Sequence, residues 1–345
     1  MKVVTAFLQV EGLQKYFPIG KNFLGRPTQV VKAVEDVSFA TERGKTLGIV
    51  GESGCGKSTT ARLLMDLSPP DQGRITIDGQ AYGKGAGRKP ITALRKRMQM
   101  VFQDSYASLN ARLTIEESIA FGPKINGASD REASTKARDL LDRVGLDPDN
   151  FIRRYPHELS GGQRQRVNIA RALAIDPEIV ILDEAVSALD KSVQAQVLNL
   201  LADLKAEFDL TYLFISHDLN VVQYVSDDVI VMYLGQVVES GPAQAMYSTP
   251  AHPYTAALLS ALPALHPKDR KTRAPLEGDP PNPISPPSGC RFHPRCPFAE
   301  PMCAETVPLL ADIGGGRHVA CHMRVPGSGY PDVRPIVTVA PSPTA

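Results

Sequence analysis

The sequence predicts an α/β fold with a buried parallel sheet core, an antiparallel β layer, a helical subdomain and a Cys-rich C-terminal extension. Three observations predict it. Short apolar runs at 46–50, 179–182 and 211–216 alternate with segments of helical spacing, which is typical of parallel strands buried on both faces. A Gly-rich loop follows the first of these runs. Four of the five cysteines lie beyond residue 289.

Composition excludes several classes of protein. The 345 residues correspond to about two domains, and 43% hydrophobic and 22% charged residues are typical of a soluble globular protein. The net charge of +1 predicts no nucleic-acid partner and no attraction to an acidic membrane surface. We expect no secretion signal at 1–17 and no spanning helix at 240–267, where prolines interrupt the uncharged run. Any membrane role should therefore act through a partner, in a reducing compartment where cysteines are free thiols or metal ligands.

The loop at 51–60, GESGCGKSTT, predicts a phosphate-binding site. It fits G-x-x-x-x-G-K-[ST] and lies between an apolar run and a helical spacing, as that motif requires. Glycines let backbone N–H groups approach phosphate oxygens, Lys57 offers a cation to the β- and γ-phosphates, and Ser58 offers a hydroxyl to Mg²⁺. Cys55 occupies a variable position of this loop, with a redox role for its thiol as the alternative. The predicted nucleotide contacts are Gly51, Ser53, Gly54, Cys55, Gly56, Lys57, Ser58 and Thr59.

Two further strand ends carry candidate catalytic groups. The run at 179–182 ends in Asp183 and Glu184, whose side chains alternate and so serve different roles. We expect Asp183 to hold hydrated Mg²⁺ and Glu184 to act as general base on a water aimed at the γ-phosphate. A helical spacing at 193–208 leads to the next strand, which ends in His217. A right-handed crossover places His217 at the same sheet edge as Glu184, within reach of the γ-phosphate.

Two more motifs complete a family pattern. The stretch 101–110 is VFQDSYASLN, and 159–173 is LSGGQRQRVNIARAL, in which a Ser-Gly-Gly sequence opens a helix whose N-terminus suits an anion. With these motifs in this order, residues 5–240 resemble the ATP-binding-cassette (ABC) ATPases. Ala185 departs from the proline that many relatives carry, at a position without a phosphate contact.

The resemblance implies a RecA-like P-loop nucleotide-binding domain and further site residues. Ser160, Gly161, Gly162 and Gln163 match the signature that contacts the γ-phosphate of ATP held by the opposite subunit. Gln103 matches the residue that reaches Mg²⁺ and the attacking water, and Asp190 matches the acid of the dimer-contact loop. Phe17 matches the aromatic that stacks on adenine, with Tyr16 as the alternative. ATP binding is then expected to close a dimer, and hydrolysis to open it.

A domain plan follows from the motifs. We expect the nucleotide-binding domain at 1–240, with a helical subdomain at about 104–173 and an antiparallel layer that includes 30–40 and 73–79, turning at Asp78–Gly79. The extension spans 241–326, beginning its Pro-rich linker near 274. A mobile tail is expected at 327–345.

The segment at 248–263, STPAHPYTAALLSALP, resembles the extension of oligopeptide/dipeptide importer ATPases. The resemblance implies ATP-driven uptake of peptides or related solutes. The implied partners are a second ATPase subunit, identical or not, two transmembrane permease subunits and an extracytoplasmic solute-binding protein. The implied place is the cytoplasmic face of the inner membrane. A soluble ABC motor for DNA repair or translation, and a non-hydrolytic metal- or redox-sensing protein, are the alternatives.

Four cysteines within 32 residues predict ligation at the C-terminal end. The gaps of five, six and seventeen residues are wider than structural zinc usually shows, and Cys296–Pro297 faintly echoes iron–sulfur motifs. Importer ATPases with a similar cysteine set imply a [4Fe–4S] cluster; zinc and unligated thiols are the alternatives. His293, His318 and His322 are possible additional zinc ligands. The predicted ligands are Cys290, Cys296, Cys303 and Cys321.

Overall fold

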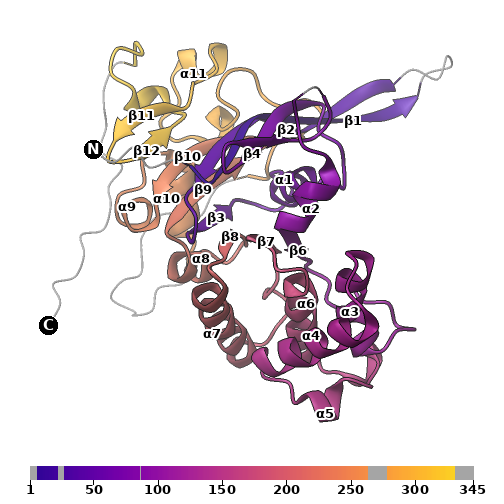
Figure 1. Cartoon of the computed structure of the whole chain (residues 1–345). Coiled ribbons are helices and arrows are strands. Elements are labelled where there is room, and N and C mark those ends of the chain that lie inside the picture. The colour runs from indigo at the N-terminus through magenta and orange to yellow at the C-terminus, as the bar shows by residue number, and fades with distance from the viewer. Residues whose placement is uncertain (1–5, 22–26, 86, 263–277, 331–345) are drawn as a thin grey trace, which may run out of the picture.

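The computed structural model of the chain describes residues 6–21, 27–85, 87–262 and 278–330 (Figure 1). The predicted tail at 327–345 therefore lies outside the described residues from 331 onward, and the start of the Pro-rich linker lies outside them up to 277. Figure 1 shows the two sheets in one lobe and the helices between residues 115 and 173 in another.

The larger sheet has eight strands in the order β11-β12-β10-β9-β3-β8-β7-β6. Its parallel core contains β3 (Thr46–Val50), β6 (Met98–Val101), β7 (Ile179–Asp183), β8 (Thr211–Ile215) and β9 (Asp228–Tyr233). Every residue of β3, β7 and β8 is buried, which explains their unbroken apolar runs. This confirms the predicted parallel core, and it brings the carboxyl ends of β6, β7 and β8 to neighbouring positions.

The antiparallel edge of the same sheet includes the C-terminal extension. β10 (Gln236–Pro242) pairs antiparallel with β9, and β12 (Arg317–Val319) pairs antiparallel with β10 and β11 (Ala311–Gly314). Arg317 contacts the fully buried Glu239 of β10 at 3.1 Å. The extension is thus built into the sheet that carries the phosphate loop.

The smaller sheet is the predicted antiparallel layer, with strand order β2-β1-β4-β5. Its strands are β1 (Leu8–Lys21), β2 (Pro27–Thr41), β4 (Gln72–Ile77) and β5 (Gln80–Tyr82). Asp78 and Gly79 have φ of 53° and 71°, as the predicted tight turn requires.

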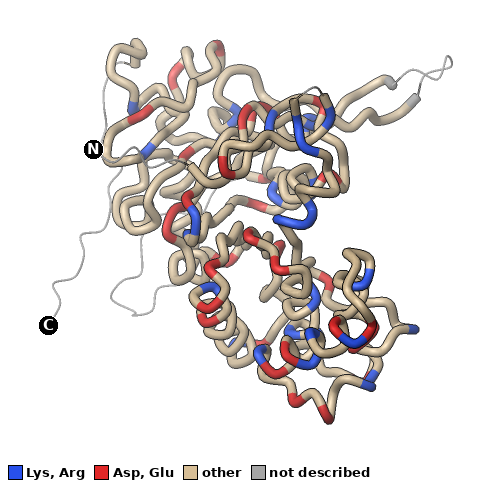
Figure 2. Tube along the Cα trace, viewed as in Figure 1, with Lys and Arg blue, Asp and Glu red and all other residues tan. Residues whose placement is uncertain are grey.

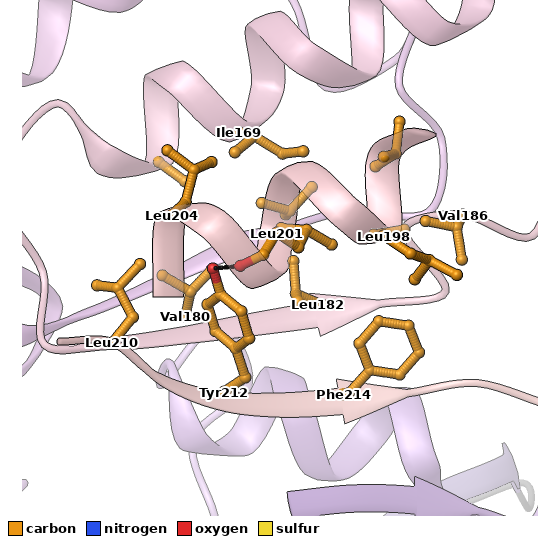
Figure 3. Close-up of a cluster of buried hydrophobic side chains, with 14 of the residues drawn as sticks. Ile169, Val180, Leu182, Val186, Leu198, Leu201, Leu204, Leu210, Tyr212 and Phe214 are labelled. Atoms are coloured by element: carbon orange, nitrogen blue, oxygen red, sulfur yellow. Dashed lines mark hydrogen bonds between the residues drawn. The ribbon is translucent and has the colours of Figure 1, made fainter. Parts of the chain in front are cut away.

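Helices cover the large sheet and form the second lobe. The loop after β3 enters α1 (Lys57–Leu64), and α7 (Lys191–Phe208) packs on β7 and β8. Figure 3 shows Leu198, Leu201 and Leu204 of α7 against the apolar side chains of these strands, with the Tyr212 hydroxyl donating to the Leu201 carbonyl at 2.9 Å. The second lobe contains α3 (Ile115–Ile125), α4 (Asp130–Arg143), α5 (Pro148–Phe151) and α6 (Gly161–Leu173). The remaining helices are α2 (Ile91–Arg97), α8 (Leu219–Val225), α9 (Ala243–Ser248), α10 (Pro253–Ser260) and α11 (Pro301–Glu305).

Charged positions are distributed along the whole described chain. Figure 2 shows acidic and basic positions interspersed over both lobes. Among the described residues, none of the helices combines the length and the apolar character that a bilayer crossing needs.

Candidate nucleotide site

Gly51 and Gly56 shape the phosphate loop between β3 and α1. Gly51 has φ of 150°, and a Cβ there would lie 2.2 Å from the Met232 carbonyl oxygen. Gly56 has φ of 109°, and its Cβ would lie 2.5 Å from the Ala33 carbonyl oxygen. Both positions therefore exclude side chains, because a backbone atom cannot move aside as a flexible side chain can. The loop leaves Ser53 and Gly54 exposed.

Lys57 lies under this loop with only 5% of its surface exposed. Its ammonium group donates to the carbonyl oxygens of Gly51 and Glu52 at 2.7 and 3.0 Å. Backbone carbonyls of the phosphate loop thus hold the Lys57 ammonium beneath the loop. Thr59 follows in the first turn of α1 and is half-buried.

Ser58 and Asp183 meet across the sheet, as the Mg²⁺ prediction requires. The Ser58 hydroxyl donates to Asp183 Oδ1 at 2.9 Å. Burial raises the pKa of Asp183, an effect that the Ser58 hydrogen bond opposes. A hydroxyl and a carboxylate side by side are the hard oxygen donors that Mg²⁺ prefers, so this pair fits the ion.

Three strand ends converge on Glu184. Its Oε2 accepts a hydrogen bond from Gln103 Nε2 at 2.9 Å and lies 3.3 Å from His217 Nδ1. Glu184 adopts the left-handed conformation, with φ of 48°, and its N–H donates to the Ile215 carbonyl at 2.9 Å. Gln103 follows β6, Glu184 follows β7 and His217 follows β8, so the strand order assembles the trio.

The Ser-Gly-Gly sequence caps α6 in the second lobe. Ser160 accepts from the Gln163 N–H at 3.3 Å, and the Gln163 side chain accepts from the Ser160 N–H at 2.9 Å. Gly162 lies against α7, where an added Cβ would be 2.5 Å from Val193. Asp190 caps α7 and accepts from the Val193 N–H at 2.9 Å. The signature at the start of α6 thus lies beside the first turn of α7, which Asp190 caps.

The two aromatic candidates on β1 differ in their surroundings. Phe17 is 38% exposed, with the Lys15 ammonium 5.6 Å from its ring centre. The Tyr16 hydroxyl instead donates to Glu35 at 2.7 Å, so this ring is anchored. Exposure leaves Phe17 more open to a stacked base, and its role stays a prediction.

Comparisons with known proteins identify the family of the chain. The ABC transporter family model matches residues 34–187, and the model of the oligopeptide/dipeptide transporter C-terminal region matches 238–303. The chain is 49% identical over 320 residues to the oligopeptide transport ATP-binding protein AppF of Bacillus subtilis, covering 92% of this chain and 97% of that protein. The chain belongs to the ATP-binding subunits of the ABC peptide-transporter family.

Other relatives agree with this family assignment. The chain is 51% identical over 324 residues to the probable peptide ABC transporter ATP-binding protein y4tS of Sinorhizobium fredii, covering 94% of this chain and 91% of that protein. The solved structure of cbiO1 from Clostridium perfringens, part of the ABC transporter complex cbiONQ, has a TM-score of 0.59 and 27% identity, covering 70% of this chain and 90% of that one. The ATP-binding cassette MJ0796, dimeric and bound to ADP and Pi, has a TM-score of 0.58 and 27% identity, covering 68% and 98%. The fold is thus that of an ABC nucleotide-binding domain, and as a member of this family the chain is an ATPase.

The four C-terminal cysteines of this ABC ATPase line one cavity. Cys290, Cys296, Cys303 and Cys321 share it with two of the candidate histidines, His293 and His322. Each of these histidines has a ring nitrogen 2.9 Å from a backbone carbonyl, of Cys290 and Thr306 respectively. The third candidate, His318, lies instead on β12.

Three of these four cysteines keep their protons at neutral pH, because burial raises the pKa of their thiols. Burial raises the pKa of Cys296 and of Cys321 to about 12, and raises that of Cys290. Among the residues that the structure describes, no group of three or more His, Cys, Asp or Glu is arranged to hold a metal ion. The cavity thus brings the predicted ligands together without placing them around an ion, and the cluster or zinc stays a prediction.

Cys55 shows no sign of the redox alternative. It is 3% exposed, and burial raises the pKa of its thiol, with nearby Lys57 acting in the opposite sense. Its sulfur packs under Gly51, where an added Cβ would lie 2.7 Å away. A buried protonated thiol that fills space explains the residue better than a reactive thiolate.

Sequence reasoning missed the residues by which the extension contacts the phosphate loop. Arg295 pairs with Glu52, and the Tyr254 hydroxyl accepts from the Glu52 N–H at 2.9 Å. These partners are separated by 243 and 202 residues. Local spacing and periodicity carry no signal for such pairs.

Proposed function

We propose that the chain binds Mg²⁺·ATP on the phosphate loop and that Glu184 is the general base for hydrolysis. The observation that carries this proposal is the convergence of Gln103 and His217 on one carboxylate oxygen of Glu184, at the sheet edge where Ser58 meets Asp183. Glu184 would take the proton of a water that Gln103 orients, while His217 and Lys57 face the charge that develops on the γ-phosphate.

Ser58 and Asp183 would hold the Mg²⁺, which when bound neutralises phosphate charge. Gln103 would be a further ligand. Burial raises the pKa of Asp183, so a bound cation would favour its ionised form. The Ser58 hydroxyl already orients Oδ1, so little rearrangement of the pair is needed.

A second subunit would complete the site. Ser160, Gly161, Gly162 and Gln163 belong to the cap of α6 in the second lobe, packed on α7 of their own chain. We place their N–H groups on the γ-phosphate of ATP held by the partner, with Asp190 at the junction. Phe17 would stack on the adenine, with Tyr16 as the alternative.

ATP hydrolysis would drive the uptake of peptides or related solutes. Support comes from relatives named as oligopeptide, dipeptide and di/tripeptide transport ATP-binding proteins, with 47–49% identity over more than nine-tenths of the chain. ATP-driven closure of an ATPase dimer would be coupled to two permease subunits, with a solute-binding protein delivering cargo from outside. The chain would lie at the cytoplasmic face of the inner membrane.

The cysteine cavity supports a narrower proposal, a [4Fe–4S] cluster on Cys290, Cys296, Cys303 and Cys321, with zinc as the alternative. Its support is one cavity lined by four thiols. Binding would require Cys290, Cys296 and Cys321, whose pKa is raised, to lose their protons. It would also require the thiols to move, because no ion-binding arrangement exists among the described side chains. Iron and acid-labile sulfide analysis after anaerobic purification tests it: stoichiometric zinc without iron excludes the cluster, and absence of both metals excludes ligation.

The central test is Glu184→Gln. Loss of the base should lower the ATP hydrolysis rate by about 10²–10⁴-fold while ATP still binds. Glu207→Gln is the matched control, because Glu207 is half-exposed on α7 and pairs with Arg143, away from the proposed site. Hydrolysis at the unmodified rate by Glu184→Gln would refute the assignment of the base.

A further inference from the structure

The C-terminal extension holds one residue of the phosphate loop through its side chain. Arg295 lies in a 3₁₀ turn, His293–Arg295, between Cys290 and Cys296. Its guanidinium donates from Nη1 and Nη2 to the two carboxylate oxygens of Glu52 at 2.8 and 3.0 Å. The Arg295 side chain is only 6% exposed, so this bidentate pair is shielded from water on the arginine side.

The same loop residue is held through its backbone. The Glu52 N–H donates to the hydroxyl of Tyr254, which is fully buried on α10. The ring of Tyr254 lies 4.6 Å from that of Tyr233 and 5.4 Å from that of Phe292, measured between centroids. An aromatic cluster therefore fixes the acceptor, and two elements of the extension determine where Glu52 sits.

Glu52 also contacts Lys57, the cation of the proposed catalytic site. Its carbonyl oxygen accepts from the Lys57 ammonium at 3.0 Å, beside the bond from Lys57 to the Gly51 carbonyl. Arg295 and Lys57 thus contact opposite ends of one residue. A shift of Glu52 would move an acceptor of the group that is to bind the β- and γ-phosphates.

A second arginine of the extension contacts Glu35, which holds Tyr16, the alternative adenine-stacking residue. Arg291, 7% exposed on its side chain, pairs with Glu35 and donates to the Leu234 carbonyl. Glu35 accepts the Tyr16 hydroxyl at 2.7 Å on its other oxygen. One short segment of the extension therefore carries two arginines toward the proposed site.

We infer that Arg295 is a positioning residue of the nucleotide site: by clamping Glu52, it makes the affinity of the phosphate loop for ATP depend on the C-terminal extension. The inference rests on the proposed role of the loop. Because the Arg295–Glu52 pair orders the loop before nucleotide binds, less conformational entropy is lost on binding. Figure 1 shows the extension in the same lobe as β3 and α1, consistent with this contact.

The experiment is a titration of the full chain with fluorescent N-methylanthraniloyl-ATP and Mg²⁺, together with melting temperatures. Arg295→Ala should weaken nucleotide affinity about tenfold. Arg295→Lys should recover part of the affinity, because an ammonium keeps the charge without the bidentate geometry. Arg317→Ala is the matched control: it removes another arginine of the extension, whose partners are Glu239 and Thr249, and should lower the melting temperature with affinity unchanged.

Glu52→Gln provides a near-isosteric second route should Arg295→Ala not fold. It should weaken nucleotide affinity in the same direction, and the double substitution Glu52→Gln with Arg295→Lys should be less than additive, as expected for partners. Unchanged affinity in both Arg295→Ala and Glu52→Gln, or equal weakening in Arg317→Ala, would overturn the inference. Absence of binding by the unmodified chain would instead count against the proposed nucleotide site.

Discussion

His252 makes the stability of the extension depend on pH in a way that can be calculated. It is 1% exposed at the start of α10, where its Nδ1 accepts from the Tyr254 N–H at 3.0 Å. Burial lowers its pKa from 6.5 to about 3. Below pH 6.5 the unfolded chain therefore binds a proton that the folded chain does not, and stability falls as the pH falls, until the folded pKa near 3 is reached.

The size of the effect follows from these two pKa values. Lowering the pH from about 7.5 to about 5.5 should cost about 1.4 kcal/mol of unfolding free energy from His252 alone. His252→Asn removes this proton site and keeps an acceptor at a helix start, where Asn is a favoured cap. The variant pays a pH-independent cost for lost packing on Phe292, whose ring centre lies 5.7 Å away.

Urea unfolding followed by far-ultraviolet circular dichroism at the two pH values measures this contribution. All other titrating groups are shared, so the unmodified chain should lose about 1.4 kcal/mol more than His252→Asn between the two pH values. His252→Gln serves as a second neutral variant. Equal losses in the unmodified chain and both variants would show that His252 is not neutral and buried when folded, and would refute the reasoning.

Three further outcomes are expected. Gly51→Ala should abolish nucleotide binding because its Cβ would meet a backbone carbonyl at 2.2 Å; nucleotide affinity equal to that of the unmodified chain in titrations would contradict this. Gly162→Ala should lower ATPase rate more than nucleotide affinity, since Val193 Cγ1 at 2.5 Å would displace the signature; steady-state kinetics that show only weaker binding would count against it. Glu178→Gln should cost about 1–2 kcal/mol in urea unfolding at neutral pH, because hydrogen bonds from arginine hold the pKa of Glu178 below its usual value; the difference should shrink as the pH falls below 4.5, the ordinary pKa of a glutamate, and a constant difference would exclude this cause.

Local sequence determined which residues meet at the proposed catalytic edge. The phosphate loop, Asp183, Glu184 and His217 each follow a short apolar strand, and parallel strands place their carboxyl ends at one edge. The glycine pattern specified a loop that excludes side chains, and the structure confirms that exclusion at Gly51. These features depend on neighbouring residues alone, so periodicity and motif spacing suffice to predict them.

Tertiary structure alone decided how the C-terminal extension joins the nucleotide site. The sequence showed its cysteines and a family resemblance, yet Arg295 meets Glu52 across 243 residues. Nor does spacing reveal that the thiols are buried in one cavity without ion-binding geometry, or that His252 is neutral. Burial and long-range pairing are properties of the packed chain, because the solvation and partners of a side chain exist only once distant segments have come together.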